Sequence, residues 1–237
     1  MKKIFHEAGT RGSSQLDWLN SKHSFSFADY YCPERIHFGA LRVLNDDIIK
    51  GGMGFGTHPH QNMEIISIPL KGALKHKDSA GHSQIVKVND VQVMTAGSGI
   101  WHSEYNASET EEAHSLQIWI IPEKDGLTPG YDQKSFPGNK EDDNLQLLVA
   151  PVNSDHKVLK INQNAYVYRA KLNSGKKLKY QINAKGNGVY LFVIKGELVV
   201  DGEVLRSRDS LGVYEVQLLD ITGMKSSDFL IFEVPMQ

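Results

Sequence analysis

The chain has 237 residues, 40% of them hydrophobic, with a formal net charge of −2 and a pI of about 6.5. This length fits one large β domain or two small ones with a sizeable core, and the charge excludes broad affinity for nucleic acid, because phosphate binding needs a positive face. The single cysteine, Cys32, excludes an internal disulfide and is typical of a reducing compartment. Since neither a signal peptide nor a membrane-spanning apolar run is found, we expect a cytoplasmic protein without membrane association.

In chain order, the first pattern is SSQLDWLNS (13–21), which favours one or two helical turns. Short β-branched segments bounded by turn residues follow, and long amphipathic patterns are scarce. We predict strands at 65–70, 83–88, 91–96, 115–121, 189–194, 197–200 and 230–234. Many short strands separated by such turns favour an all-β sandwich or barrel.

Residues 122–144 interrupt this pattern with prolines, glycines and charges. Such a composition predicts an interdomain connection on the surface. Beyond it, residues 189–216 repeat the rhythm of strand, Lys-Gly turn and strand that begins at residue 65. The echo suggests two similar β-barrels in one chain.

Two histidines one residue apart stand in THPHQNMEIISIPLKGA, directly ahead of a predicted strand. Side chains on a strand alternate between its two faces, so His58 and His60 share a face. In TAGSGIWHSEYN, His102 and Glu104 repeat this spacing. If the chain between them returns antiparallel, three imidazole nitrogens and one carboxylate oxygen converge. That donor set suits a divalent transition metal.

Glycine clusters precede both pairs and let the backbone bend or approach another chain closely. Strict alternation from His60 also turns Glu64 inward, as a ligand, as a partner that orients an imidazole, or as a core carboxylate paired elsewhere. The remaining histidines are expected to be ordinary surface or satisfied core residues: His6, His23, His37, His76, His82, His114 and His156.

HPHQNMEIISIPLKGALKHKDSAG, followed by DVQVMTAGSGIWHSE, closely resembles the pirin family of the cupin superfamily, in the form of the bacterial pirin-like quercetinases. Upstream, LDWLNSKHSFSFADYY and FGALRVLNDD are similar to the family's N-terminal signature. The resemblance implies an all-β bicupin, two β-barrel domains of the double-stranded β-helix type with few short helices. It places a metal-binding cupin domain at residues 1–135 and a degenerate cupin domain without a metal site at 136–237.

The resemblance also implies the metal ligands His58, His60, His102 and Glu104. General cupins use an acidic ligand at the position of Glu64, whereas pirins take it from the second motif, so we place Glu64 in the surroundings of the ligands. Fe(II) is the expected metal, and Mn, Ni, Co, Cu or Zn also fit the donors, because ligand type alone does not select the ion. Met63, Trp101 and Phe55 are candidates to receive flat rings near the metal.

For activity, the resemblance implies a metal-dependent dioxygenase that opens flavonols such as quercetin. The metal would bind the 3-hydroxyl and Glu104 would act as the base. The alternative is a non-enzymatic, metal-dependent regulator that binds transcription factors or other protein partners, and a different metal enzyme is a third hypothesis, because one fold hosts many functions. The expected partners are a phenolic substrate and dioxygen, with no direct nucleic-acid binding, and we expect a monomer.

Overall fold

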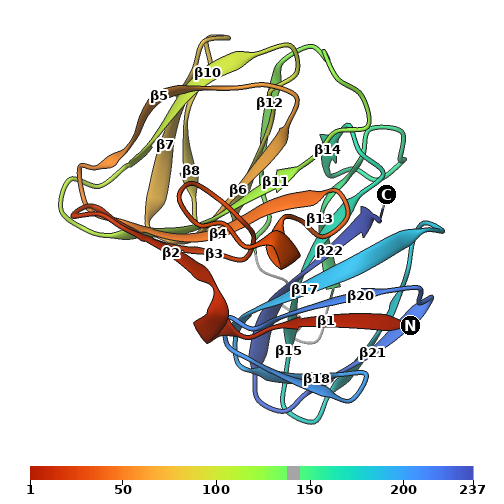
Figure 1. The fold of residues 1–237 in the computed structure, drawn as a ribbon. Helices are drawn as coiled ribbons and strands as arrows, with labels where there is room; N and C mark the ends of the chain where they lie inside the picture. Colours follow the sequence, from red (N-terminus) through yellow and green to blue (C-terminus); the bar gives the residue numbers. More distant parts are fainter. Residues whose placement is uncertain (138–144, 237) are drawn as a thin grey trace.

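The computed structural model describes residues 1–137 and 145–236 and builds them into four antiparallel-rich sheets arranged as two units (Figure 1). One sheet of the N-terminal unit has the order β12-β9-β6-β11-β4-β3-β2. Its strands are β2 (Gly12–Gln15), β3 (Leu19–His23), β4 (Leu41–Ile49), β6 (Glu64–Lys71), β9 (Asp90–Thr95), β11 (Ala113–Ile120) and β12 (Gly130–Ser135). The facing sheet, in the order β5-β10-β7-β8, contains β5 (Gly54–His60), β7 (Ala73–Asp78), β8 (Ser83–Lys87) and β10 (Ile100–Asn106).

The C-terminal unit repeats this plan. Its larger sheet, in the order β1-β20-β17-β22-β15-β13-β14, contains β1 (Lys2–His6), β13 (Leu145–Pro151), β14 (Leu159–Ile161), β15 (Tyr166–Leu172), β17 (Asn187–Lys195), β20 (Ser210–Tyr214) and β22 (Ser227–Pro235). The smaller sheet, in the order β16-β21-β18-β19, contains β16 (Lys177–Gln181), β18 (Glu197–Val200), β19 (Glu203–Arg206) and β21 (Leu218–Gly223). Two 3₁₀ turns, η1 (Ala8–Thr10) and η2 (Pro33–Arg35), are the helical elements of the described residues.

The two large sheets pack against each other through a shared apolar core. Alternation along β11 sends Leu116, Ile118 and Ile120 into this core, where side chains of β17 and β22 meet them. The intervening positions of β11 face the inside of the N-terminal unit. The all-β prediction of two similar units is therefore confirmed. Each predicted strand coincides with an observed one, although the predictions 83–88, 91–96 and 115–121 run one residue past its end.

The interiors of the two units differ in polarity. The C-terminal unit is filled mainly by aliphatic and aromatic side chains such as Leu191 and Phe229. Its buried carboxylate, Glu233, accepts hydrogen bonds from Tyr180 and Asn187. The N-terminal unit instead buries polar side chains, among them Ser67, Gln92 and Glu104. Because buried polar groups cost free energy unless they are paired or functional, this polarity marks the N-terminal unit as the place to look for a site.

Two local predictions are wrong. Residues 13–21 are not helical, because β2 and β3 form a hairpin whose turn is closed by Leu16 N–H donating to Leu19 C=O at 2.9 Å. The segment 122–144 is not entirely a surface connection either, because residues 130–135 add β12 to the edge at β9. Residues 138–144 of that segment lie outside the described residues.

The N-terminal strand crosses to the other unit, where β1 pairs with β20 (Figure 1). The first six residues therefore lie on the C-terminal unit, although the chain that follows builds the N-terminal one. In the part of the chain that the structure describes, no helix has the length and apolarity to cross a membrane.

Candidate metal centre

The two motif strands lie side by side. β5 and β10 are antiparallel neighbours, with His102 opposite His58 and Ile100 opposite His60. A bulge follows His102, so the register shifts before Glu104. The antiparallel return that the motif spacing required is therefore present, and it brings both motifs to one edge of the N-terminal unit.

Three imidazoles meet at this edge. The ring centres of His58, His60 and His102 are 4.5–4.8 Å apart in each pair, and the Nε2 atoms of His58 and His102 are 3.0 Å apart. His58 Nδ1 is 2.7 Å from the carbonyl oxygen of Gly56. Since a carbonyl only accepts, His58 carries its proton on Nδ1 and presents the Nε2 lone pair to the other rings.

Burial keeps the rings of His60 and His102 neutral. It lowers the pKa of His60 to about 4, and the neighbouring imidazoles His102 and His58 lower it as well. The pKa of His102 falls to about 3, again first through burial and then through its histidine neighbours. Neutral imidazoles at pH 7 are the form that binds metal ions, so the triad needs to release no proton from these two rings.

Glu104 is held inside the unit next to His102. It is 1% exposed, and its two carboxylate oxygens accept hydrogen bonds from Ser67 Oγ at 3.0 Å and Gln117 Nε2 at 2.6 Å. An oxygen of Glu104 lies within 4.8 Å of ring nitrogens of His102 and His76, and this group overlaps the three-histidine group at His102. The structure therefore brings together three of the predicted ligands, His58, His60 and His102. It places the fourth, Glu104, beside His102.

His76 is the residue of this cluster that motif reasoning missed, because it had been assigned to the ordinary histidines. It is fully buried on β7. The sequence LKHKD contains the signal that finds it: Leu74, His76 and Asp78 are buried, while Lys75 and Lys77 alternate outward. An alternating strand that turns a histidine and an aspartate inward with a leucine indicates a polar interior.

Of the roles that the sequence left open for Glu64, the structure shows a core carboxylate paired elsewhere, and the expected place around the metal ligands is wrong. The chain turns at Asn62, which has a φ of 51°, so the alternation from His60 is lost. The Glu64 carboxylate accepts hydrogen bonds from Thr95 Oγ1 at 2.8 Å and from Asn162 Nδ2 at 2.9 Å. Glu64 lies on the face of β6 that packs into the core between the units. Ser67 lies on the opposite face of the strand and contacts Glu104.

A cavity of about 740 Å³ opens beside the histidines. His58 and His60 line it, and aromatic side chains form much of its wall: Trp18, Phe27, Tyr30, Phe55 and Trp119. Phe55 was expected here. Met63 instead packs beside Ile65 and Met94, and Trp101 is 54% exposed and borders a smaller outer pocket.

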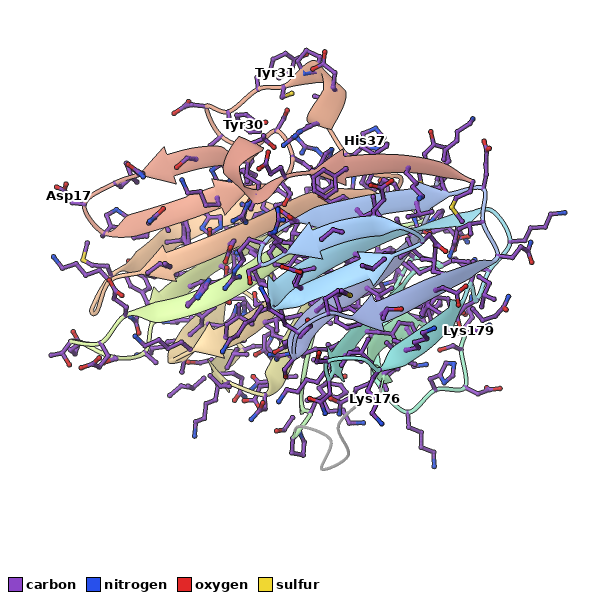
Figure 2. The ribbon with its side chains drawn as sticks, turned by 90° about the horizontal axis from the view of Figure 1, so that it is seen from below. Asp17, Tyr30, Tyr31, His37, Lys176 and Lys179 are labelled. Atoms are coloured by element: carbon purple, nitrogen blue, oxygen red, sulfur yellow. The ribbon has the colours of Figure 1, made fainter. Side chains whose placement is uncertain are left out.

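Part of the cavity wall belongs to the loop between β3 and β4. Phe27 and Tyr30 come from this loop, which projects at the edge of the molecule where Tyr30 and Tyr31 are labelled (Figure 2). The Tyr30 ring lies over Gly12, where an added Cβ would be 2.2 Å from the ring. The glycine therefore lets the loop sit close to β2 and close one side of the cavity.

The donor set of this site fits a divalent transition metal. The His58–His102 contact leaves His58 with an unprotonated nitrogen directed at a second ring. His102 is buried, whereas His58 and His60 are partly exposed. Imidazole and carboxylate donors suit iron, nickel, copper or zinc, and the cavity leaves room for a further ligand. Both groups of side chains that could hold a metal in the described residues lie in the N-terminal unit.

The other histidines that we expected to be surface or satisfied core residues are hydrogen-bonded or exposed. Nδ1 of His6 contacts the Tyr190 hydroxyl at 2.9 Å, and Nε2 of His114 contacts Asp46 at 2.5 Å. His156, which follows β13 in the C-terminal unit, is exposed. His23, His37 and His82 also have hydrogen-bond partners. Their assignment is confirmed, with His76 as the exception.

Comparison with protein families and curated proteins gives one consistent result. The family described as Pirin matches residues 5–120, and the family described as quercetinase C-terminal cupin domain matches residues 147–234. A protein of Escherichia coli (strain K12) named quercetin 2,3-dioxygenase is 41% identical over 229 residues, 97% of each chain. A pirin-like protein of Caulobacter vibrioides is 37% identical over 222 residues, which cover 94% of this chain and 95% of that one.

Solved structures agree. YhhW from Escherichia coli matches with a TM-score of 0.94 at 40% identity, covering 100% of this chain and 99% of that one. The same bacterial pirin in complex with nickel(II) matches with a TM-score of 0.93 at 39% identity over 100% of both chains. The two units are thus cupin domains of a bicupin, and the chain belongs to the pirin family.

Proposed function

We propose that this pirin is a metal-dependent dioxygenase that opens flavonols such as quercetin. The observation that carries the proposal is that two imidazoles of the triad, His58 and His60, form part of the wall of a large aromatic cavity. A metal held there would face whatever enters. The name and 41% identity of the Escherichia coli relative support the same reaction.

The proposed ligands are His58, His60, His102 and Glu104. A divalent metal bound to them, Fe(II) as first choice, would act as a Lewis acid that lowers the pKa of a phenolic hydroxyl. Nickel(II) is the ion of the bacterial pirin complex from Escherichia coli. Mn, Co, Cu and Zn also fit these donors, because the order of intrinsic affinities does not decide occupancy in a cell.

The cavity has the size and the walls for a flat polyphenol. Ligand pockets commonly enclose about 300–1,000 Å³, and this cavity encloses about 740 Å³. Two edge-to-face pairs, Trp18 with Phe55 and Phe27 with Trp119, have ring centres 5.2 and 5.4 Å apart. Aromatic walls of this kind pack against flat rings and fix their plane.

One side of the cavity is polar and suited to phenolic hydroxyls. His23, Asn45 and Asp47 line it. Burial raises the pKa of Asp47 to about 7, although a short hydrogen bond from Ser21 opposes the shift, and the neighbouring carboxylates Asp46 and Glu104 add to it. At neutral pH, Asp47 therefore exists in both forms and can donate to, or accept from, a substrate hydroxyl.

Glu104 is the proposed general base. Ser67 and Gln117 fix its carboxylate, and Trp119 Nε1 donates to Gln117 Oε1 at 3.1 Å, which fixes Gln117 in turn. A Glu104 oxygen takes the proton of the 3-hydroxyl, and the resulting electron-rich flavonolate reacts with dioxygen. Both oxygen atoms enter the product and one ring carbon leaves as carbon monoxide, so the reaction balances without an added reductant.

The test is an anaerobic titration. Quercetin added to Fe(II)-loaded chain is expected to shift the flavonol absorption, and admitted oxygen is expected to bleach it. Chain stripped by a chelator is the control and should give neither change. No turnover with Fe, Mn, Ni, Co, Cu or Zn would refute the proposal and leave the non-enzymatic regulator as the reading to test by metal-dependent capture of protein partners.

Three further assignments belong to this proposal. We place the domains at residues 1–135 and 136–237. The N-terminal strand β1 belongs to the first range in sequence but pairs with β20 of the second domain. The second domain has a structural role, since its interior is filled with apolar side chains. A monomer in the cytoplasm is the expected form, and light scattering with cell fractionation tests it.

A further inference from the structure

A second buried histidine stands behind the metal ligand His102. His76 lies on β7, which pairs with β10 on the side away from β5, with His76 opposite Glu104 and Asp78 opposite His102. The ring centres of His76 and His102 are 5.4 Å apart. A ring nitrogen of each and an oxygen of Glu104 lie within 4.8 Å of one another. His76 is neither a ligand nor the base in the proposed reaction.

Asp78 sets the tautomer of His76. Its Oδ2 lies 3.1 Å from His76 Nε2, while its Oδ1 accepts the backbone N–H groups of Ala80 and His82, each at 3.0 Å. Because a carboxylate only accepts, the His76 proton stays on Nε2 and Nδ1 keeps a lone pair. The Tyr131 ring, 4.8 Å from the His76 ring, covers the histidine from β12.

The ring nitrogens of His76 and His102 that lack a partner complement each other in hydrogen-bonding capacity. His102 directs Nε2 toward His58, so its proton resides on Nδ1 when Nε2 binds a cation. Nδ1 of His102 and Nδ1 of His76 are both buried, and neither has a hydrogen-bond partner in the described part of the chain. One is then a donor without an acceptor, and the other is an acceptor without a donor.

We propose that His76 is a positioning residue for His102; this inference rests on the metal site of the proposed function. His76 Nδ1 accepts the Nδ1–H of His102, directly or through one buried water that has two to four polar neighbours. The chain from Asp78 through His76 thereby fixes the His102 ring and presents its Nε2 to the metal. Side chains that orient a ligand in this way commonly contribute about 10–100-fold in metal affinity.

The test measures Co(II) affinity by chelator competition, together with the d–d absorption of bound Co(II). His76→Phe removes the acceptor and is expected to weaken binding about 10–100-fold. His76→Gln keeps an oxygen acceptor and an N–H donor toward Asp78, so it should retain most of the affinity. The Co(II) spectrum should change in the Phe variant and stay close to wild type in the Gln variant.

Asp78→Asn gives the sharpest comparison. The two backbone N–H groups hold the amide oxygen where Asp78 Oδ1 now lies, so the amide N–H₂ faces His76 Nε2. The His76 proton must then move to Nδ1, where it opposes the Nδ1–H of His102. This isosteric change is expected to weaken Co(II) binding at least as much as His76→Phe.

The matched controls are Lys77→Gln, which points outward from the same strand, and His6→Phe, a buried histidine of the other unit. Both should bind Co(II) like wild type. Wild-type affinity in Asp78→Asn and His76→Phe would overturn the positioning role. Wild-type chain that binds no Co(II) overturns the metal site and this role together, whereas tight, His76-dependent binding without quercetin turnover removes only the proposed reaction. Urea unfolding checks each variant, and where His76→Phe does not fold, the Gln and Asn variants decide.

Discussion

β5 passes close to the backbone of β10 at Gly54, and Gly54→Ala tests whether this close approach builds the metal site. A Cβ at Gly54 would lie 2.4 Å from the carbonyl oxygen of Glu104 and 2.4 Å from Cα of Tyr105. Ordinary contacts of a Cβ are 3.4–4 Å. Both obstacles are backbone atoms, so relief requires the two strands to separate by about 1 Å, since rotation of a side chain cannot provide it.

Two effects of this separation are expected. Overpacking of a well-packed site costs about 1–3 kcal/mol in the free energy of unfolding. His58 lies on β5 and Glu104 on β10, so separating the strands also moves these two groups apart. A displacement of about 1 Å between catalytic groups costs on the order of 100-fold in turnover. Urea unfolding of metal-free chain measures the first effect, and quercetin turnover with chelator competition measures the second.

Gly56→Ala is the matched control. A Cβ there would meet only the Tyr105 hydroxyl, at 3.8 Å, and neither glycine has a positive φ. We therefore expect Gly56→Ala to keep wild-type stability and metal affinity. Equal behaviour of the two variants would refute the reasoning, since it would show that the close contact at Gly54 does not set the spacing of the strands.

Three further predictions concern single ionisable groups. Glu104→Gln should lower kcat for quercetin by about 100-fold or more, and it should weaken the anaerobic absorption shift as well, because the 3-hydroxyl loses its base; unchanged kinetics would show that the proton goes elsewhere. Asp47 has its folded-state pKa raised to about 7 from 3.8, so the folded chain binds the extra proton and stability should fall as pH rises from about 4 through 7; Asp47→Asn should flatten this loss, and an unaltered pH profile in urea unfolding would contradict it. His6 has its pKa lowered to about 4 from 6.5, first by burial and then by Arg35, so its contribution is complete above pH 6.5 and is lost toward pH 4, by about 3 kcal/mol at most; His6→Gln should make this acid limb shallower, and an equally steep limb would count against it.

Much of the fold followed from local patterns. The strands at residues 65–70 and 197–200 have β-branched runs between turn signals, and each was found within one residue or two of its bounds. The hairpin at 13–21 was missed because its alternation is interrupted by the turn at Leu16. β12 was missed because a charged edge strand resembles a loop, and pairing with β9 decides its conformation.

The site was predictable to the extent that spacing alone defines it. The i, i+2 spacing puts His58 and His60 on one face, and the antiparallel pairing places His102 opposite His58. The turn at Asn62 could not be read from alternation, so Glu64 was assigned to the wrong face of the sheet. The Trp119 wall of the cavity and the partnership of β7 with β10 depend on long-range pairing, which no local pattern contains.

The central claim is that His58, His60, His102 and Glu104 hold one divalent transition metal at the wall of the cavity. Elemental analysis after stripping and reloading tests it most directly, on wild type and on His60→Ala, which removes one donor that lines the cavity. The account predicts about one tightly held ion per wild-type chain and a loss of at least ten-fold in affinity for the variant. Equal metal content in the two proteins, or none in wild type after loading with Fe(II), Ni(II) and Co(II) in turn, would contradict it.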